Sequence, residues 1–336
     1  MVEFPFHQRP ALFVGRNDDL LAVVALLQHQ GAALVIGVSG VGKSELVREV
    51  AHRLVARRWV MPERVHFVAL GNSSDAHGMR TSIGVALGIS VEQLPSQDHL
   101  ADSWLMAQLP PRTLLILDEA ENAIHSGGRA VYNLLELLAQ QPRCYLLVTS
   151  QNDIGSPHLP AYNLTRLTPQ AALQLFVRTA NLRPAEWAQL DLTDLDAVLT
   201  VVDRLPRAVE LVAKVWRFRR NTDLKTVRAD LERHADQILQ DPRYPDEVKS
   251  VTVGIQLAYE RLHERNPDAA MLFAQLALFP GGLAEAGVVP IFGESAAALL
   301  PLIEDQSLIE RPFADLLYLP APLQSFGRRQ LSMGTE

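Results

Sequence analysis

Residues 37–44 have the types and the spacing of a loop that binds phosphate groups. They read Gly-Val-Ser-Gly-Val-Gly-Lys-Ser, which matches the pattern G-x-x-x-x-G-K-[ST]. Three glycines without side chains let the backbone bring its N–H groups close to anionic oxygens. Lys43 adds a cation, and Ser44 adds a hydroxyl that can bind Mg²⁺. The chemistry predicted for this segment is the binding of a phosphate chain together with a divalent cation.

The segments on either side of this loop support the same interpretation. An apolar run at Ala32–Val38 predicts a strand before the loop, and the periodicity of Glu45–Arg57 predicts a helix after it. The positive end of the helix dipole would then point at the bound anion. The alternative, a glycine turn before an amphipathic helix, does not require Lys-Ser after the last glycine. We therefore interpret the segment as a phosphate-binding loop.

A pair of acidic residues forms the second candidate for chemistry. Asp118 and Glu119 directly follow the apolar run Leu114–Leu117, which is typical of a strand buried on both faces. Asp118 is predicted to bind Mg²⁺, and Glu119 to orient or deprotonate an attacking water. The alternative for such a pair is an ordinary solvated helix cap.

The elements that would position these residues alternate between strand and helix. Further strands are predicted at Val65–Leu70, Tyr145–Val148 and Tyr162–Leu167, with helical segments between them. This alternation predicts an α/β domain over residues 1–167, with a mostly parallel sheet covered by helices on both faces. The ligand of such a domain is expected at the carboxyl ends of the strands.

The rest of the chain changes character after Thr168. Residues 168–243 contain only helical patterns and predict an all-α subdomain. Residues 244–336 contain helices followed by two short strands, predicted at Ser307–Glu310 and Leu316–Leu319. Helices followed by such a hairpin predict a winged helix-turn-helix domain.

Composition excludes several classes of protein. The chain of 336 residues has a formal net charge of −7, and residues 250–336 hold ten acidic residues against five arginines. A nucleic-acid backbone would be repelled by that balance, so nucleic acid is not expected as a partner of the winged helix. The one cysteine, Cys144, is predicted to be a core residue. No apolar run reaches the roughly 18–20 residues that span a bilayer, which predicts a cytoplasmic protein without a membrane partner.

The order of motifs along the chain provides a family resemblance. Leu114–Glu119 has the form of a Walker B strand, and Leu147–Ser150 has the form of a sensor strand. The whole series resembles STAND nucleoside triphosphatases, in particular their bacterial NB-ARC-like (AP-ATPase) branch. The other segments that carry the resemblance are Phe13–Arg16 with Asp19-Leu20, Leu167–Phe176, Leu205-Pro206 with Ala208–Leu211, and Ala277–Gly282 with Asp305–Leu308.

The resemblance implies a regulatory switch that binds ATP or ADP with Mg²⁺ and hydrolyses ATP slowly. ADP would hold the winged helix over the nucleotide, and exchange for ATP would permit homo-oligomerisation. Effector or sensor modules would be supplied in cis or in trans. The predicted catalytic residues are Lys43, Asp118 and Glu119, and the predicted metal ligands are Ser44 and Asp118. The predicted nucleotide contacts are Val14, Arg16, Gly37, Ser39, Gly40, Val41, Gly42, Lys43, Ser44, Glu45, Gln151 and Pro206, with adenine near Val14, Arg16 and Pro206.

Three positions depart from the family pattern. Gln151 stands where the family usually has an arginine that contacts the γ-phosphate, and Ala321 stands where its winged helix usually has a histidine. Arg204 stands in place of a glycine. A neutral amide forms a weaker bond to phosphate than a guanidinium does. These departures favour nucleotide binding over hydrolysis.

Two other functions share some of these features. A DNA-binding transcriptional regulator could use the winged helix, although its acidic balance opposes this. Another P-loop ATPase, such as a motor of the AAA+ type, would share the loop. The sequence shows no convincing arginine finger for such a motor, which argues against it, although Arg143 and Arg166 stay candidates for that role.

Overall fold

The computed structural model describes residues 12–71, 73–95, 97–218, 223–240, 246–313 and 315–333. Contacts divide the chain into two units. The first unit contains Met1–Gly37 and Lys43–Leu164. The second contains Thr165–Glu336 together with Val38–Gly42, five residues of the glycine-rich loop.

The first unit is built on a five-stranded parallel sheet in the order β2-β3-β4-β1-β5. Residues 114–117 are fully buried, because helices cover both faces of the sheet. This burial explains why the sequence of β3 is a continuous apolar run and not an alternating one. The strands are β1 (Ala32–Ile36), β2 (Val65–Ala69), β3 (Thr113–Asp118), β4 (Cys144–Ser150) and β5 (Ala161–Asn163).

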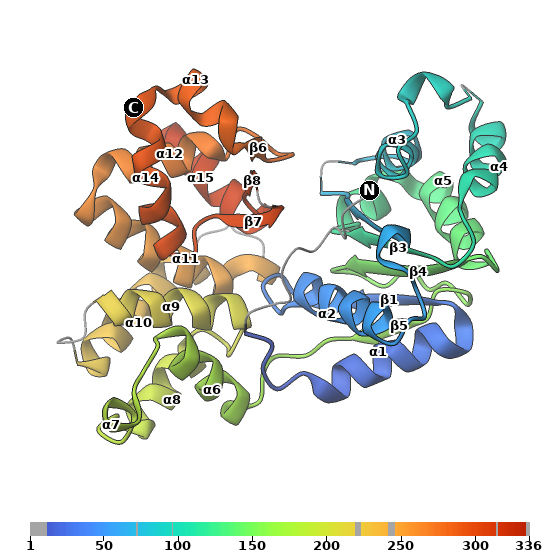
Figure 1. Cartoon of the computed structure of the whole chain (residues 1–336). Helices are drawn as coiled ribbons and strands as arrows, with labels where there is room; N and C mark the ends of the chain where they lie inside the picture. The colour runs from blue at the N-terminus through green and yellow to red at the C-terminus, as the bar shows by residue number, and fades with distance from the viewer. Residues whose placement is uncertain are drawn as a thin grey trace. The chain divides into compact units, whose positions relative to one another are not determined.

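Five helices cover this sheet, and they divide between its two faces (Figure 1). Helices α1 and α2 pack together on one face, and α3, α4 and α5 pack on the other. The predicted α/β architecture with helices on both faces is therefore confirmed. The helices are α1 (Asn17–Gln30), α2 (Lys43–Ala56), α3 (Ala76–Ala86), α4 (Asp98–Gln108) and α5 (Glu121–Ala139).

Cys144 begins β4 and is part of the apolar core of this unit, as the sequence predicts. Only 5% of its surface is exposed. Burial raises the pKa of its thiol to about 12, because the charged thiolate would lose its hydration.

The second unit begins with a group of helices. Helix α9 packs against α6 and α11, and α10 packs against α8 and α11. The absence of a side chain at Gly254 permits a close approach, because a Cβ added there would lie 3.3 Å from the Cα of Ala208. The helices are α6 (Pro169–Thr179), α7 (Pro184–Trp187), α8 (Leu192–Val201), α9 (Pro206–Phe218), α10 (Leu224–Gln240) and α11 (Asp246–Arg265).

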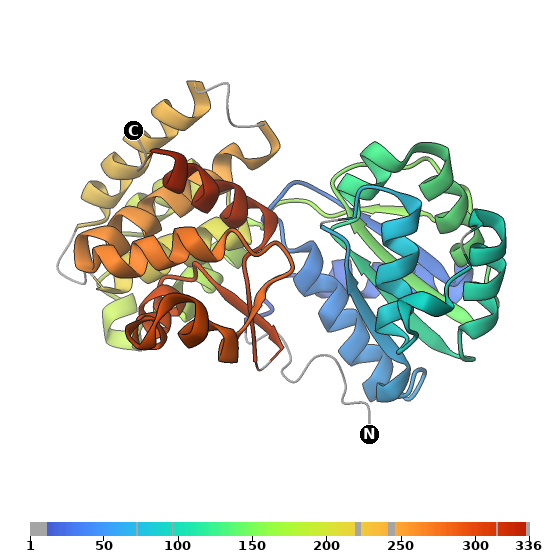
Figure 2. The same cartoon turned by 90° about the horizontal axis from the view of Figure 1, so that it is seen from above.

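The same unit ends in further helices and a small antiparallel sheet in the order β6-β8-β7. Helix α15 packs against α11 and α12 (Figures 1 and 2). The rings of Tyr259, Phe273 and Phe326 join these three helices, with centroids 5.4–6.4 Å apart. The elements are α12 (Pro267–Leu276), β6 (Leu283–Ala284), α13 (Val288–Phe292), α14 (Glu294–Asp305), β7 (Glu310–Phe313), β8 (Leu316–Tyr318) and α15 (Ala321–Met333). Over the described residues, no helix combines the length and the apolar character that a bilayer crossing requires.

The strand predicted at Ser307–Glu310 is wrong in its position, because β7 begins only at Glu310. Ser307 has a φ of +55°, and the N–H of Leu308 donates back to the carbonyl of Ile303. These features close the end of α14, so the chain cannot yet be extended there. The strand predicted at Tyr162–Leu167 is shorter than expected, because β5 ends at Asn163.

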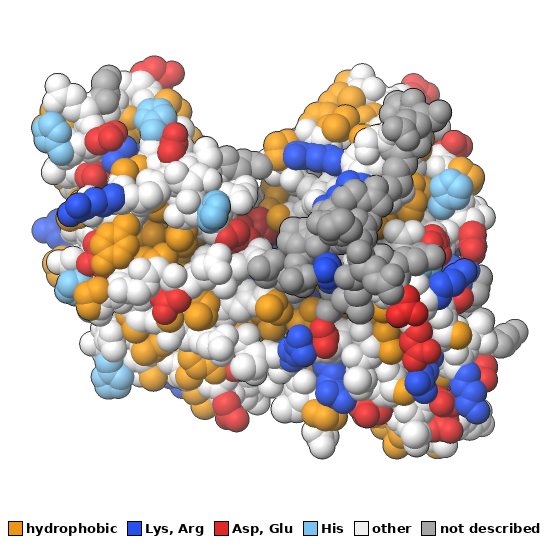
Figure 3. Space-filling view, turned by 180° about the vertical axis from the view of Figure 1, so that it is seen from behind, with side chains coloured by type: hydrophobic (Ala, Val, Ile, Leu, Met, Phe, Trp, Pro, Cys, Tyr) orange, Lys and Arg blue, Asp and Glu red, His pale blue; other side chains and the backbone are white. Residues whose placement is uncertain are grey.

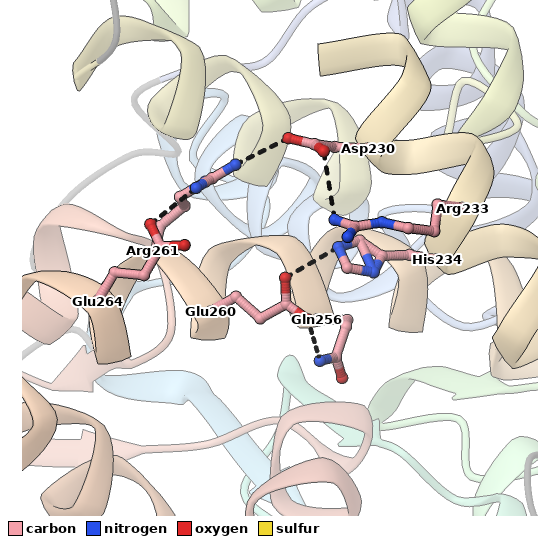
Figure 4. A network of polar contacts seen from close by, with 7 residues as sticks. All are labelled: Asp230, Arg233, His234, Gln256, Glu260, Arg261 and Glu264. Carbon is pink, nitrogen blue, oxygen red and sulfur yellow. Dashed lines mark hydrogen bonds and ion pairs between the residues drawn. The ribbon is translucent and has the colours of Figure 1, made fainter. Parts of the chain in front are cut away.

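A network of charged side chains joins α10 to α11 (Figure 4). Asp230 accepts hydrogen bonds from Arg261 at 2.8 Å and from Arg233 at 3.2 Å. Nε2 of His234, which is 2% exposed, lies 3.0 Å from Oε2 of Glu260. The network is completed by bonds from Gln256 to Glu260 at 2.7 Å and from Arg261 to Glu264 at 2.7 Å.

We expect His234 to make the fold less stable as the pH falls below about 6.5. Burial lowers the pKa of His234, and the carboxylate of Glu260 opposes that shift only in part. The unfolded chain therefore takes up the proton more readily than the folded chain, so stability rises with pH through this range. Urea unfolding at pH 7.5 and 5.5 measures the effect. His234→Gln should show a smaller difference between the two pH values than the parent chain shows. A part of the difference should remain in both proteins, because both retain His66, whose pKa is also lowered by burial. An equal difference would contradict this prediction.

Candidate functional site

The glycine-rich loop connects β1 to α2, as the sequence predicts, and α2 begins at Lys43. Gly40 and Gly42 have φ values of +75° and +97°, which residues with side chains rarely adopt. The N–H of Val41 donates to the carbonyl of Val38 at 3.3 Å. Among the described residues, none accepts a hydrogen bond from the amides of Gly40 or Gly42. These two amides are therefore available to an anion at the start of a helix.

The side chain of Lys43 reaches back over the loop. Its Nζ donates to the carbonyl of Gly37 at 2.8 Å. Burial lowers the pKa of Lys43, and the charges of Glu121, Asp118 and Glu119 oppose the shift, with Glu121 contributing most. An ammonium group in this position can exchange its carbonyl partner for a phosphate oxygen.

Ser44 and Asp118, the two predicted metal ligands, lie in direct contact. Oγ of Ser44 donates to Oδ1 of Asp118 at 3.0 Å, and Oγ1 of Thr149 donates to the same oxygen at 2.5 Å. Both contacts follow from topology, because β1, β4 and β3 are successive parallel neighbours whose carboxyl ends meet at one edge, and Ser44 lies shortly after β1. A hydroxyl and a carboxylate at this spacing are hard oxygen ligands, and the pair fits a Mg²⁺ ion.

The turn from β3 to α5 is fixed by Thr149. The backbone N–H of Glu119 donates to Oγ1 of Thr149, and the N–H of Ala120 donates to its carbonyl, both at 2.9 Å. Glu119 has a φ of +58°, which is unusual for glutamate. Its Oε2 would lie 2.8 Å from a Cβ added to Gly71, so its carboxylate lies beside the segment that follows β2.

Gln151, which follows β4, contacts a carboxylate that the sequence analysis missed. Its Nε2 donates to Oε1 of Glu121 at 3.3 Å. Oε2 of Glu121 is buried and has no hydrogen-bond partner in the part of the chain that the structure describes. Thr149 was also missed as a site residue, although it lies within the sensor strand. The same feature of the sequence could have identified Glu121 and Thr149. Polar residues at or after the ends of apolar strands meet at one edge of a parallel sheet.

The predicted adenine contacts upstream of the loop are buried. Val14 and Arg16 are each 7% exposed. Nη1 of Arg16 lies 3.3 Å from Oδ2 of Asp19, whose Oδ1 accepts a 2.6 Å hydrogen bond from the hydroxyl of Tyr162. Tyr162 is paired with Val35 of β1, so this motif lies beside the strand that leads into the loop.

Removing the Tyr162 hydroxyl should weaken the anchoring of this motif. We expect Tyr162→Phe to lower the free energy of unfolding by about 1 kcal/mol, because the carboxylate of Asp19 loses one hydrogen bond. Urea denaturation measures the change. Tyr132→Phe is a suitable control, since no hydrogen bond of its hydroxyl is observed among the described residues. A loss that is equal in the two variants would argue against the role given to Tyr162.

The remaining predicted contacts lie close to the loop in sequence or in the second unit. Ser39 and Val41 are buried. Glu45 pairs with Arg48 at 2.8 Å in the first turn of α2. Pro206 begins α9, and its Cγ would lie 3.7 Å from a Cβ added to Gly42, which belongs to the same unit. Their contacts with a nucleotide stay predictions.

The backbone at position 204, where the resemblance leads us to expect a glycine, has a conformation that suits glycine. Arg204 has a φ of +51°, in the region that favours glycine. Its Nη2 donates to Oγ1 of Thr200 at 2.9 Å, and its carbonyl accepts from the N–H of Leu167. The arginine therefore adopts the backbone conformation that a glycine would adopt more easily.

Comparison with known proteins agrees with this geometry. Residues 26–154 match the sequence model of a family described as "AAA domain". The matched segment contains the glycine-rich loop, Asp118 and Thr149. Residues 26–154 form a P-loop NTPase domain. The parallel sheet with helices on both faces is the fold of such a domain.

Comparison with individual proteins extends over a larger part of the chain. Proteins of Mycobacterium tuberculosis and Mycobacterium bovis, both described as uncharacterized, are 28% identical over 216 residues, which is 60% of this chain and 50% of theirs. The alignment thus spans about half the length of these curated relatives. A solved STAND protein with a tetratricopeptide repeat sensor, from Pyrococcus horikoshii, has a TM-score of 0.64 and 16% identity. The superposed part includes 98% of this chain and 44% of the STAND protein. The similarity shows a shared fold.

Proposed function

We propose that the chain is a nucleotide-controlled switch of the STAND class that binds ATP or ADP with Mg²⁺. The observation that carries the proposal is the convergence at one sheet edge of Lys43 and the Ser44–Asp118 pair, whose oxygens are 3.0 Å apart. The P-loop NTPase domain that contains them supports the same conclusion. The NB-ARC-like branch is the part of that class whose motif order the chain resembles.

Each residue of the site has a defined role in this proposal. The amides of Gly40 and Gly42 and the ammonium of Lys43 bind the phosphate chain, and Ser44 and Asp118 hold Mg²⁺. A magnesium ion at this position would neutralise charge on the terminal phosphates. Adenine contacts by Val14, Arg16 and Pro206 are part of the proposal, as are those of Ser39, Val41 and Glu45 with the nucleotide.

The contacts of Arg207 in the second unit support a switching role. Its backbone N–H donates to the carbonyl of Gly40 at 3.3 Å, and its Nη2 donates to the carbonyl of Ser307 at 2.7 Å. Nη1 lies 3.1 Å from Glu310 at the start of β7. One residue thus bonds both to the loop and to the segment proposed to be a winged helix, residues 244–336. A phosphate that changes the hydrogen bonding of the loop would bias this packing.

Further parts of the proposal rest on the resemblance and on the STAND structure with its repeat sensor. These are slow ATP hydrolysis, ATP-dependent homo-oligomerisation, and effector or sensor modules in cis or in trans. The helical subdomain at residues 168–243 would transmit the nucleotide state. On the face drawn in Figure 3, Lys and Arg side chains are interspersed with Asp and Glu, which does not favour nucleic acid as a partner of that face. The cytoplasmic location stays a prediction.

Calorimetric titration of the purified chain tests the proposal. We expect ADP and ATP to bind with micromolar or better affinity in the presence of Mg²⁺, and GTP to bind more weakly. Asp118→Asn should reduce the part of the ATP affinity that depends on Mg²⁺. Light scattering after gel filtration should show a larger assembly with ATP than with ADP. A chain that releases no nucleotide on denaturation and binds neither ADP nor ATP would refute the proposal.

A further inference from the structure

A polar pocket lies at the amino ends of the strands, at the edge of the sheet opposite to the glycine-rich loop. Its volume is about 660 Å³, and all of its lining residues belong to the first unit. They come from the end of α1, the start of β3, the end of α5, the start of β4 and the loop between β4 and β5. None of the residues proposed to bind nucleotide or Mg²⁺ lines it. A pocket of this volume is large enough to hold a small molecule.

Two arginines of this pocket, Arg112 and Arg143, lie on neighbouring strands. Thr113 of β3 pairs with Cys144 of β4 in parallel register, so the residues that directly precede this pair are neighbours as well. The N–H of Thr113 donates to the carbonyl of Arg143 at 3.1 Å, which fixes the approach of the two segments. Both arginines are exposed, and both line the pocket. Their positive charges repel each other in this arrangement, and an anion bound between them would remove that repulsion.

No carboxylate neutralises Arg112 or Arg143 in the part of the chain that the structure describes. Neither guanidinium forms an ion pair or a side-chain hydrogen bond there, and no aspartate or glutamate is among the described residues that line the pocket. Arg80 of the same unit shows the contrast, because it contacts Asp98 at 2.7 Å and Asp102 at 2.6 Å. Acidic residues outnumber Lys and Arg in the sequence by 38 to 31, so carboxylates are not scarce. The two arginines therefore retain their N–H donors for an anion that the chain itself does not supply.

His158 is the third basic side chain of the pocket, and Glu136 positions it. Nδ1 of His158 lies 2.7 Å from Oε2 of Glu136, whose other oxygen accepts a hydrogen bond from the hydroxyl of Ser156. Oγ of Ser156 also accepts from the N–H groups of His158 at 3.2 Å and Leu159 at 3.0 Å. The loop that carries His158 is therefore anchored to α5. Because Nδ1 is at the carboxylate, Nε2 is the ring nitrogen that can contact a ligand.

We propose that this pocket binds the phosphate group of a small phosphomonoester. The planar guanidinium groups of Arg112 and Arg143 present paired N–H donors that match the oxygens of a phosphate. Nε2 of His158 adds a third contact. Gln30 lines the same pocket with a neutral amide, which suits an uncharged body with hydroxyl groups, such as a sugar. The inference does not rest on the proposed function, because the pocket and the glycine-rich loop lie at opposite edges of the sheet.

The ends of two helices provide a competing explanation for the arginines. Helix α1 ends at Gln30 and α5 ends at Ala139, and both residues line the pocket. Positive charge is favourable near the carboxyl end of a helix. Arginines with that role alone would contribute to stability in the same way whether phosphate is present or absent. A binding site instead predicts an effect of phosphate that is lost together with the arginines.

Calorimetric titration of the full chain, saturated with ADP and Mg²⁺ so that the proposed nucleotide site is occupied, tests the proposal. The probes are glucose 6-phosphate, inorganic phosphate and glucose. We expect glucose 6-phosphate to bind with a dissociation constant of about 1 mM or lower, and glucose not to bind. Arg112→Gln and Arg143→Gln should each weaken this binding by at least about tenfold, the effect of losing one charged hydrogen bond. Inorganic phosphate that binds as tightly as the ester would identify free phosphate as a sufficient ligand.

Arg58→Gln is the matched control for these variants. Like Arg112, Arg58 is an exposed arginine with a left-handed backbone conformation, with φ values of +59° and +58°. It does not line the pocket and forms no ion pair among the described residues, so its loss should leave binding unchanged. Arg143→Lys keeps the charge without the paired donors and should weaken binding less than Arg143→Gln does. Thermal unfolding gives a second measurement, since phosphate at equal ionic strength should raise the Tm of Arg58→Gln more than that of Arg112→Gln.

The inference is overturned if neither glucose 6-phosphate nor inorganic phosphate binds to the parent chain, or if Arg112→Gln and Arg143→Gln bind them as tightly as Arg58→Gln. It is also overturned if binding disappears in Lys43→Met, because the phosphate would then occupy the glycine-rich loop. A chain that binds no ADP and still binds glucose 6-phosphate through the two arginines would refute only the proposed function, so the two failures are distinguishable.

Discussion

Lys43→Met should lower the affinity for ADP and ATP by about 100-fold, which corresponds to about 3 kcal/mol. The ammonium of Lys43 donates to the carbonyl of Gly37 in the structure, and a phosphate would give it a partner of opposite charge. Stability should stay the same or rise, because burial already disfavours the charged form and lowers the pKa of Lys43. Calorimetric titration and urea unfolding measure the two effects.

Lys225→Met provides the control for that experiment. The side chain of Lys225 is 71% exposed on α10 and its Nζ lies 3.9 Å from a carboxylate oxygen of Asp194. Its loss should change neither affinity nor stability by more than about 0.5 kcal/mol. If Lys43→Met binds ADP as tightly as the control, the loop is not a phosphate site.

Thr149→Val should have the second large effect. The hydroxyl of Thr149 donates to Asp118 and accepts from the N–H of Glu119, and valine has nearly the same shape without either bond. A buried N–H left unpaired and a carboxylate that loses a donor should cost about 2 kcal/mol of unfolding free energy. ATP hydrolysis should fall at least about tenfold, because the turn that carries both glutamates is no longer fixed.

Thr113→Val separates the two consequences of that change. Thr113 is equally buried at the opposite end of the same sheet, where its hydroxyl donates to the carbonyl of Pro110 at 2.8 Å. This variant should lose about 1 kcal/mol of stability and hydrolyse ATP at the parent rate. A Thr149→Val protein that is as active as Thr113→Val would show that the hydroxyl has only a structural role.

Much of the first unit could be predicted from the sequence, and the physical reason is burial. Strands covered on both faces, such as residues 114–117, must be continuously apolar, and that run is easy to recognise. The contact between Ser44 and Asp118 was predictable as well, because the carboxyl ends of parallel strands meet.

The direction of side chains after the strand ends could not be predicted. Glu119 adopts a φ of +58° that its residue type does not favour, so the sequence gives no sign that its carboxylate turns toward Gly71. Gln151 and Thr149, which bond to Glu121 and Asp118, are 30 and 31 residues away from them along the chain. Such contacts depend on register between strands. The late start of β7 was unpredictable for a local reason, because Ser307, like Glu119, adopts a left-handed backbone conformation.

The burial of Cys144 has a practical consequence for experiments on nucleotide-dependent motion. A thiol whose pKa is raised to about 12 is protonated at neutral pH, and its sulfur is shielded from reagents by the core. Because the sequence contains no other cysteine, a cysteine introduced on any exposed position would be the one thiol that reacts with a fluorescent maleimide. Dyes for distance measurements could thus be attached to the native chain without first removing Cys144.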